Sequence, residues 1–173
     1  IKWLGIGIES GDREVRLEVS KGKFKDVDIK EVVRKVEDAD INVMANYIFG
    51  LPTDTRESME KTLDLAIDLG TLGWNGYSAM PLPGSQLYKD AVEAGWDLPK
   101  DYVGYSFHSY TTTPVPTDNL TSKEILQFRD NAYVKYHTSE KFLKKVKNKY
   151  GQDAVDNILK NTKIKLKRKL LGD

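Results

Sequence analysis

The stretch of sequence that decides the fold is Asn42–Thr55, which reads NVMANYIFGLPTDT. Its first part, Val43–Phe49, is apolar and rich in strand-forming residues, and it stops at the turn residues Gly50–Pro52. A continuous apolar run of this length, bounded by a turn, predicts a strand that is covered on both faces. Asp54 followed by Glu57 resembles a capping box, so a helix is predicted directly after the turn. In parallel α/β folds, ligands bind where such strands end.

Two further strands are predicted near Ile1–Ile8 and Trp74–Met80, and each is followed by turn residues and a helical pattern. Strands that alternate with helices predict a parallel sheet with right-handed crossovers. The pattern changes after residue 95. Residues 96–120 are predicted to form a linker or loop segment, in which 105–111 could form an edge strand, and 121–173 a helical extension with a basic tail. The helices are expected near 12–20, after Asp28, and near 55–69, 86–94, 121–136, 139–150 and 152–160.

Composition sets limits on the class of protein. The chain has 173 residues, a net charge of +1 and no cysteine, which excludes disulfides, cysteine nucleophiles and thiolate metal sites within it. No apolar run approaches the ~18–20 residues that a membrane span needs. A cytoplasmic location is therefore expected. Because the predicted strand starts at Ile1, we expect the chain to be cut from a longer protein.

Polar and apolar residues meet where the predicted strands end. Glu9 and Ser10 follow the first strand, Asn46–Gly50 closes the second, and Met80–Pro81 closes the third. A carboxylate accepts hydrogen bonds from vicinal hydroxyls and apolar residues cover a ring, so this combination suits a ligand with a sugar and a flat base. Two structural alternatives remain open. Glu9 and Ser10 could cap the next helix, and the residues after Phe49 could form only a turn.

Three motifs carry a resemblance to a known family. They are Gly7–Gly11 (GIESG), Asn46–Thr55 (NYIFGLPTDT) and Pro81–Tyr88 (PLPGSQLY). In order and spacing they resemble the C-terminal half of a radical S-adenosylmethionine enzyme core. The most similar branch includes cobalamin-binding radical enzymes, methylthiotransferases and the oxygen-independent coproporphyrinogen oxidase. The resemblance covers residues 1–95, and the part after residue 120 more loosely resembles the helical extension of the cobalamin-dependent branch.

The resemblance implies an α/β fold: half of a partial (β/α)6 TIM-like barrel, with three parallel strands and flanking helices, followed by a helical C-terminal extension. It implies S-adenosylmethionine as a cofactor, a 4Fe–4S cluster in the parent enzyme, and cobalamin as a further cofactor of that branch. The cofactor-binding residues that it implies are Glu9, Ser10, Lys21, Asn46, Ile48, Phe49, Met80 and Pro81.

The implied roles differ from residue to residue. Glu9 would accept hydrogen bonds from the ribose hydroxyls with Ser10 beside it, and Asn46 would lie on the ribose or substrate side. Lys21 would bind the cofactor's carboxylate, although a lysine at a helix end is also favoured there by the helix dipole. Ile48 and Phe49 would lie against the adenine. The backbone near Met80 and Pro81 would close the edge of the adenine.

The chain departs from the family pattern in ways that limit its chemistry. Thr53 stands where the family usually has a glycine. The family's Cys-x3-Cys-x2-Cys loop and its glycine-glycine-glutamate site are both absent. No catalytic residue and no metal ligand are therefore expected in this chain. It is expected to be a fragment that supplies part of the cofactor- and substrate-binding surface and is inactive alone.

Partners and alternative functions follow from the two ends of the chain. The missing N-terminal half of the barrel is one expected partner, and self-association through the uncovered first-strand edge is another. The substrate, a small molecule or an RNA, is not identified by the sequence. The basic stretch Lys160–Lys169 favours either a solvated helix face or a nucleic-acid or anionic-membrane patch, so a stand-alone interaction or nucleic-acid-binding module is an alternative. A fragment of another (β/α) barrel enzyme is a third alternative.

Overall fold

The computed structural model describes residues 1–23 and 25–173. Within them, helices alternate with strands in the first half and follow one another in the second. None of the helices built by these residues is long and apolar enough to cross a membrane. The elements are β1 (Trp3–Glu9), α1 (Arg13–Val19), α2 (Ile29–Asp38), β2 (Asn42–Phe49), α3 (Arg56–Leu69), β3 (Gly73–Ser78), α4 (Gln86–Glu93), α5 (Ser122–His137), α6 (Glu140–Tyr150) and α7 (Gln152–Asn161), with 3-10 turns at Tyr102–Tyr105 and Lys169–Leu171.

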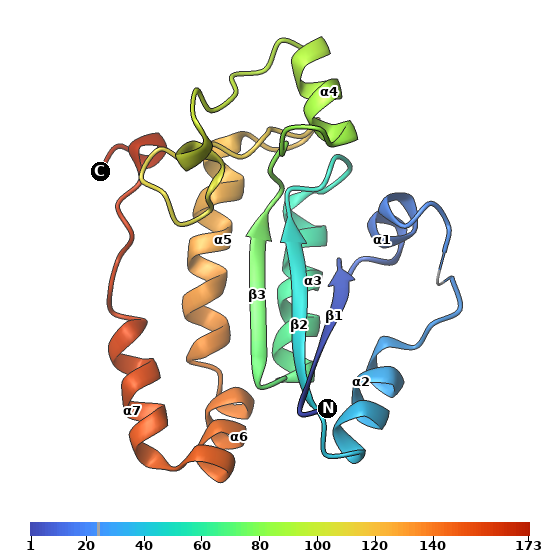
Figure 1. The fold of residues 1–173 in the computed structure, drawn as a ribbon, viewed down its shortest axis with the longest axis vertical. Helices are drawn as coiled ribbons and strands as arrows, with labels where there is room; N and C mark the ends of the chain where they lie inside the picture. Colours follow the sequence, from blue (N-terminus) through green and yellow to red (C-terminus); the bar gives the residue numbers. More distant parts are fainter. Residues whose placement is uncertain (24) are drawn as a thin grey trace.

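The three strands form one open parallel sheet in the order β1-β2-β3. β1 and β2 are aligned from Trp3 opposite Asn42, and β2 and β3 from Met44 opposite Gly73. The carboxyl ends of all three strands lie at the same end of the sheet, beneath α4 in Figure 1. The predicted α/β fold, three parallel strands with flanking helices and a helical C-terminal part, is thereby confirmed.

The two faces of the sheet differ in how they are covered. Along β2, residues 43, 45, 47 and 49 are fully buried, whereas residues 42, 44, 46 and 48 are half-buried. Successive side chains of a strand point to opposite faces, so one face is packed against helices and the other is not. We call the half-buried side the open face. The strand expected to be covered on both faces is thus fully covered on one of them only.

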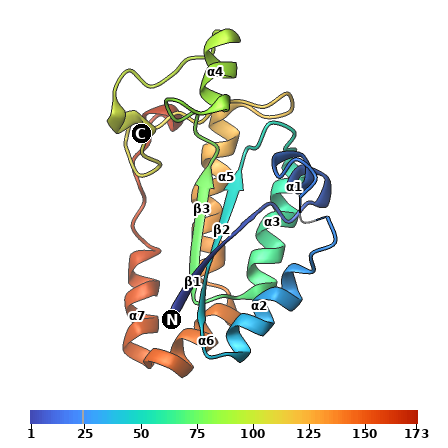
Figure 2. The ribbon, with the colours of Figure 1, turned by 45° about the vertical axis from the view of Figure 1, so that its right-hand side comes forward.

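The covered face and the C-terminal helices share one apolar core. The ring of Phe49 lies 5.2 Å from the ring of Phe128 in α5, and Trp74 of β3 stacks on Tyr136 at 5.2 Å. The Tyr136 hydroxyl donates to the Thr71 carbonyl at 2.6 Å. The same cluster continues through α3 into α6 and α7. α5 therefore packs directly on the sheet, as Figure 2 shows, and α6 and α7 extend the same apolar core.

The turn after β2 is built differently from the predicted capping box. Thr55, not Asp54, is the N-cap of α3, and its reciprocal partner is Ser58 rather than Glu57. The buried Asp54 carboxylate accepts from the backbone N–H groups of Gly50 at 3.0 Å and Leu51 at 2.9 Å. Asp54 therefore holds the turn itself. The helix start that it predicted is correct, but the capping residues were wrong.

Residues 96–120 cross the carboxyl end of the sheet without forming a strand. The segment suggested as an edge strand, 105–111, consists of turns in the structure, so that expectation was wrong. A small second cluster of Ala79, Ala91 and Val115 joins this segment to α4, with Ile48 packed against it. α4 and the crossing segment thus cover the ends of β2 and β3.

Candidate functional site

Two asparagines link all three strands on the open face. Asn46 and Asn75 lie opposite each other in β2 and β3, and the Asn75 amide nitrogen donates to Asn46 Oδ1 at 2.8 Å. Asn46 Nδ2 in turn donates to the Ile6 carbonyl of β1 at 3.2 Å. Asn75 was not among the predicted site residues. Its sequence signal is a polar residue inside a predicted strand, whereas its pairing with Asn46 depends on the register between β2 and β3.

Glu9 ends β1 in an unusual conformation. Its φ is 63°, the left-handed region that costs a non-glycine residue roughly 1–2 kcal/mol. The carboxylate lies back over Gly7, and a Cβ on Gly7 would collide with Glu9 Oε1. Since Gly7 is the register partner of Asn46, this places the Glu9 carboxylate beside the asparagine pair. Burial raises the pKa of the Glu9 carboxyl above its ordinary value.

A cavity of about 740 Å³ opens next to Glu9. Its walls come from β1, α1, α2 and the end of β2, and they are mostly apolar. Glu9 and Ile48, two of the predicted site residues, both line it. A carboxylate at the side of an apolar cavity can orient a ligand that carries hydroxyl groups and a ring.

Ser10 and Lys21 lie outside this arrangement. The Ser10 side chain is fully buried, and its hydroxyl pairs with the Thr62 hydroxyl at 3.1 Å and accepts from the Asp12 N–H. Lys21 is exposed in the turn after α1, one residue beyond Ser20, which lines the cavity. The roles of Ser10 and Lys21 as contacts to the cofactor therefore stay predictions.

The remaining predicted residues are divided between the two faces and the end of the sheet. Phe49 is fully buried on the covered face, opposite in direction to Ile48. Met80 is half-buried beyond β3, where its carbonyl accepts from the Leu82 N–H at 2.9 Å, and Pro81 is buried beside it. The structure thus brings Glu9, Asn46 and Ile48 near one another and does not bring Phe49 to them.

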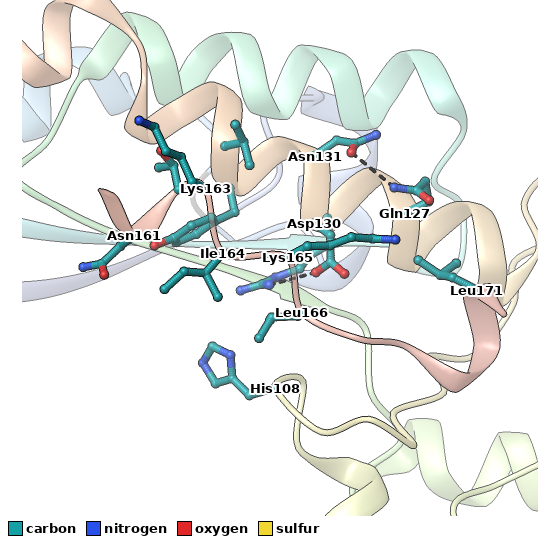
Figure 3. A pocket seen from close by; sticks show the side chains of 14 residues that line it. His108, Gln127, Asp130, Asn131, Asn161, Lys163, Ile164, Lys165, Leu166 and Leu171 are labelled. Carbon is teal, nitrogen blue, oxygen red and sulfur yellow. Dashed lines mark hydrogen bonds and ion pairs between the residues drawn. The ribbon is translucent and has the colours of Figure 1, made fainter. Parts of the chain in front are cut away.

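A second cavity, of about 450 Å³, lies between α5 and the C-terminal tail. Figure 3 shows it with His108 on one side and Ile164 to Leu166 crossing it. Part of the predicted basic tail is not available to an external partner, because Arg168 is fully buried and binds Asp130. Lys165 is exposed and pairs with Asp173 at 2.6 Å. No sequence signal distinguished Arg168 from its exposed neighbours.

We expect the strain at Glu9 to be measurable. Glu9→Gly should raise the free energy of unfolding by about 1 kcal/mol, because glycine adopts a positive φ without a steric clash. Glu9→Gln keeps the strain and removes only the charge. Chemical denaturation of both variants checks this. A Glu9→Gly protein less stable than the parent would contradict the strain described here.

The pH dependence of the same variants has a defined sign. Because the folded-state pKa of Glu9 is raised, folding opposes its ionised form, and that penalty disappears as the pH falls through the folded-state pKa. The stability advantage of Glu9→Gln over the parent should therefore be largest at neutral pH and shrink on acidification. An advantage that grows in acid would be inconsistent with burial of this carboxylate.

Comparison with known proteins gives two distant relatives. An anaerobic magnesium-protoporphyrin IX monomethyl ester cyclase of Cereibacter sphaeroides is 27% identical over 137 residues, which are 78% of this chain and 21% of the relative. An uncharacterized methyltransferase of Pyrococcus horikoshii is 26% identical over 139 residues, which are 80% of this chain and 29% of the relative. No family model matches the chain. The chain thus spans less than a third of either relative's length and is distantly similar to a cyclase that acts anaerobically and to a methyltransferase.

Proposed function

We propose that the chain is part of a radical S-adenosylmethionine enzyme and supplies one half of its cofactor- and substrate-binding surface. The observation that carries the proposal is the Glu9 carboxylate, held over Gly7 on the open face at a cost in backbone strain. Strained backbone clusters at functional sites, where the surrounding structure maintains it. A carboxylate kept half-buried beside an apolar cavity suits the two ribose hydroxyls of an adenosyl group.

The residues present fit one part of the cofactor set and not the other. Glu9 would accept from the ribose, Ile48 would cover the base, and Asn46 would lie on the side of the substrate. S-adenosylmethionine would supply the carbon-centred group that the parent enzyme transfers or uses as a radical. The iron–sulfur cluster does not fit this chain, since it has no cysteine. Any cluster must be bound by another part of the protein.

The two relatives support this assignment through their named chemistry. Methyl transfer commonly uses S-adenosylmethionine as the methyl donor. The other relative is named as an anaerobic cyclase, so its reaction takes place without dioxygen. S-adenosylmethionine chemistry is compatible with both names. The relatives' own substrates belong to much longer proteins and do not identify the substrate here.

The proposal also assigns a partner to the uncovered edge of β1. In the described part of the chain, β1 pairs with β2 alone, and Trp3 and Leu4 are 44% and 39% exposed. A strand edge with apolar side chains is a template for pairing with another strand. In the whole enzyme this partner would be the other half of the barrel. In the isolated chain it would be a second copy.

Self-association through this edge gives a direct test. We expect the isolated chain to form a dimer as its concentration rises, and Leu4→Lys to shift it towards the monomer because a lysine on an edge strand opposes pairing. Sedimentation velocity over a concentration series measures the shift. Leu82→Lys is the matched control, since Leu82 is also exposed but lies beyond β3. A clean monomer at high concentration would count against the edge as an interface.

The proposed function itself is tested on the whole protein that contains this chain. After anaerobic purification and cluster reconstitution, we expect binding of S-adenosylmethionine, measured by equilibrium dialysis, and its cleavage on reduction. Glu9→Gln should weaken binding about tenfold, the loss of one charge-assisted hydrogen bond. Its iron content should not change. Glu14→Gln, an exposed carboxylate on α1, is the control. Unaltered binding by Glu9→Gln would overturn the role given to Glu9.

A further inference from the structure

The C-terminal tail carries the largest fully buried side chain of the described residues, Arg168. Its guanidinium binds the Asp130 carboxylate of α5 in a two-point contact, with Nε to Oδ2 and Nη2 to Oδ1 both 2.8 Å. Asp130 also accepts from Arg129 Nη1 at 3.0 Å. One carboxylate therefore holds two buried arginines, and we call these three residues the arginine–aspartate cluster.

Arg129 connects this cluster to the edge of the sheet. Its Nε donates to the Gly76 carbonyl of β3 at 2.8 Å. The Ala79 N–H donates to the Phe49 carbonyl of β2, so the backbone groups of Ala79 point towards β2. Because these groups alternate in direction from one residue to the next along a strand, the Gly76 carbonyl points away from β2. Arg129 thus binds one carbonyl on the outer edge of β3. Its guanidinium also lies over the ring of Phe107, 5.0 Å from the centroid.

Phe107 is the point where the cluster meets the open face. Its ring packs edge-on against Tyr77 at 5.1 Å, and Tyr77 is the next open-face residue of β3 after Asn75. The segment after Phe107 is held by the tail. Arg168 Nη1 donates to the Ser109 carbonyl at 2.9 Å, and the Lys169 N–H donates to the Tyr110 carbonyl at 2.9 Å.

We propose that the arginine–aspartate cluster positions Phe107 as a wall of the open face on its β3 side, so that the C-terminal tail forms part of the binding site. The description of this face as a site rests on the proposed function. The cluster makes the contacts that such a role requires. Asp130 binds Arg168 of the tail, and the tail in turn binds the backbone of residues 109 and 110. Arg129 lies over the ring of Phe107. Phe107 and Tyr77 then bound the space beside the asparagine pair.

The position of the ring can be read without any ligand. 4-Fluorophenylalanine at position 107 gives one fluorine resonance, which senses both the Arg129 cation and the Tyr77 ring. Asp130→Asn removes the shared charge and should shift and broaden this resonance. Hydrogen exchange of residues 106–111 should rise about tenfold, while that of β2 stays unchanged. Lys163 lines the cavity between α5 and the C-terminal tail but lies outside the cluster. Lys163→Ala should therefore change neither the fluorine resonance nor the hydrogen exchange of residues 106–111.

A second variant keeps the test decisive if Asp130→Asn does not fold. Arg168→Lys retains the charge but loses the two-point geometry, so it should release residues 106–111 partially. Equal acceleration of β2 and the 106–111 segment, or an unmoved fluorine resonance, would overturn the positioning role. These readouts do not depend on S-adenosylmethionine. Failure of Glu9 to bind the cofactor would therefore leave the result for the cluster intact.

Discussion

Tyr136→Ala is expected to lower the free energy of unfolding by about 3–5 kcal/mol, the range found when a large buried aromatic side chain is removed. The side chain is fully buried, stacks on Trp74 of β3 and donates a hydrogen bond to the Thr71 carbonyl. Its loss would leave a cavity between α5 and the sheet. Urea denaturation followed by circular dichroism measures the change.

Tyr136→Phe separates the hydrogen bond from the packing. It should cost only about 1–3 kcal/mol, the penalty for a buried carbonyl that loses its donor. The comparison also tests whether the sheet and the helical extension unfold together. If Tyr136→Ala leaves the stability of β2 unchanged in hydrogen exchange, the two parts are independent units, contrary to the shared core described above.

Phe49→Ala and Ile48→Ala are expected to have opposite profiles although the two residues are neighbours. Phe49 is fully buried against Phe128, so its truncation should cost about 3–5 kcal/mol of stability. Ile48 is half-buried on the open face and lines the cavity beside Glu9. Its truncation should cost clearly less stability and, under the proposed function, weaken cofactor binding in the whole protein.

Phe49→Leu serves as the conservative control, since it keeps most of the apolar volume in the core. It should recover a large part of the stability lost by Phe49→Ala and leave cofactor affinity unchanged. Loss of affinity without loss of stability in Phe49→Leu would mean that this ring reaches the ligand. That outcome would contradict the placement of Phe49 on the covered face.

The elements of the fold could be predicted from local sequence because each has a local cause. The apolar run from Val43 to Phe49 forms β2, and the glycine turn after it ends the strand as predicted. Thr121 and Glu124 form a capping box at the start of α5, the helix that was predicted near 121–136. The sequence pattern also showed which residues of the strand are apolar. It did not tell which of two adjacent apolar residues faces the helices, since that depends on what packs against the sheet.

The features that the sequence did not reveal depend on residues far apart in the chain. Arg168 and Asp130 are 38 positions apart, and nothing near either predicts the pair. Arg129 carried a usable signal, because it lies on the same helical stripe as Ile125 and Ala132, which are buried. The Asn46–Asn75 pair required the register between β2 and β3. Pairing of this kind follows from the three-dimensional arrangement of distant segments and not from local sequence.

The two edges of the sheet are not equivalent. On the outer edge of β3 the Gly76 carbonyl is already bound by Arg129, whereas β1 has no strand beyond it in the described chain. The edge of β1 is therefore the freer of the two for pairing between copies, and two copies that pair through it would meet β1 to β1. Such a contact uses the same surface on both molecules and closes on itself after two. Oligomerisation by this route would stop at a symmetric pair, whereas longer assembly would also have to use the outer edge of β3, where Arg129 binds the Gly76 carbonyl.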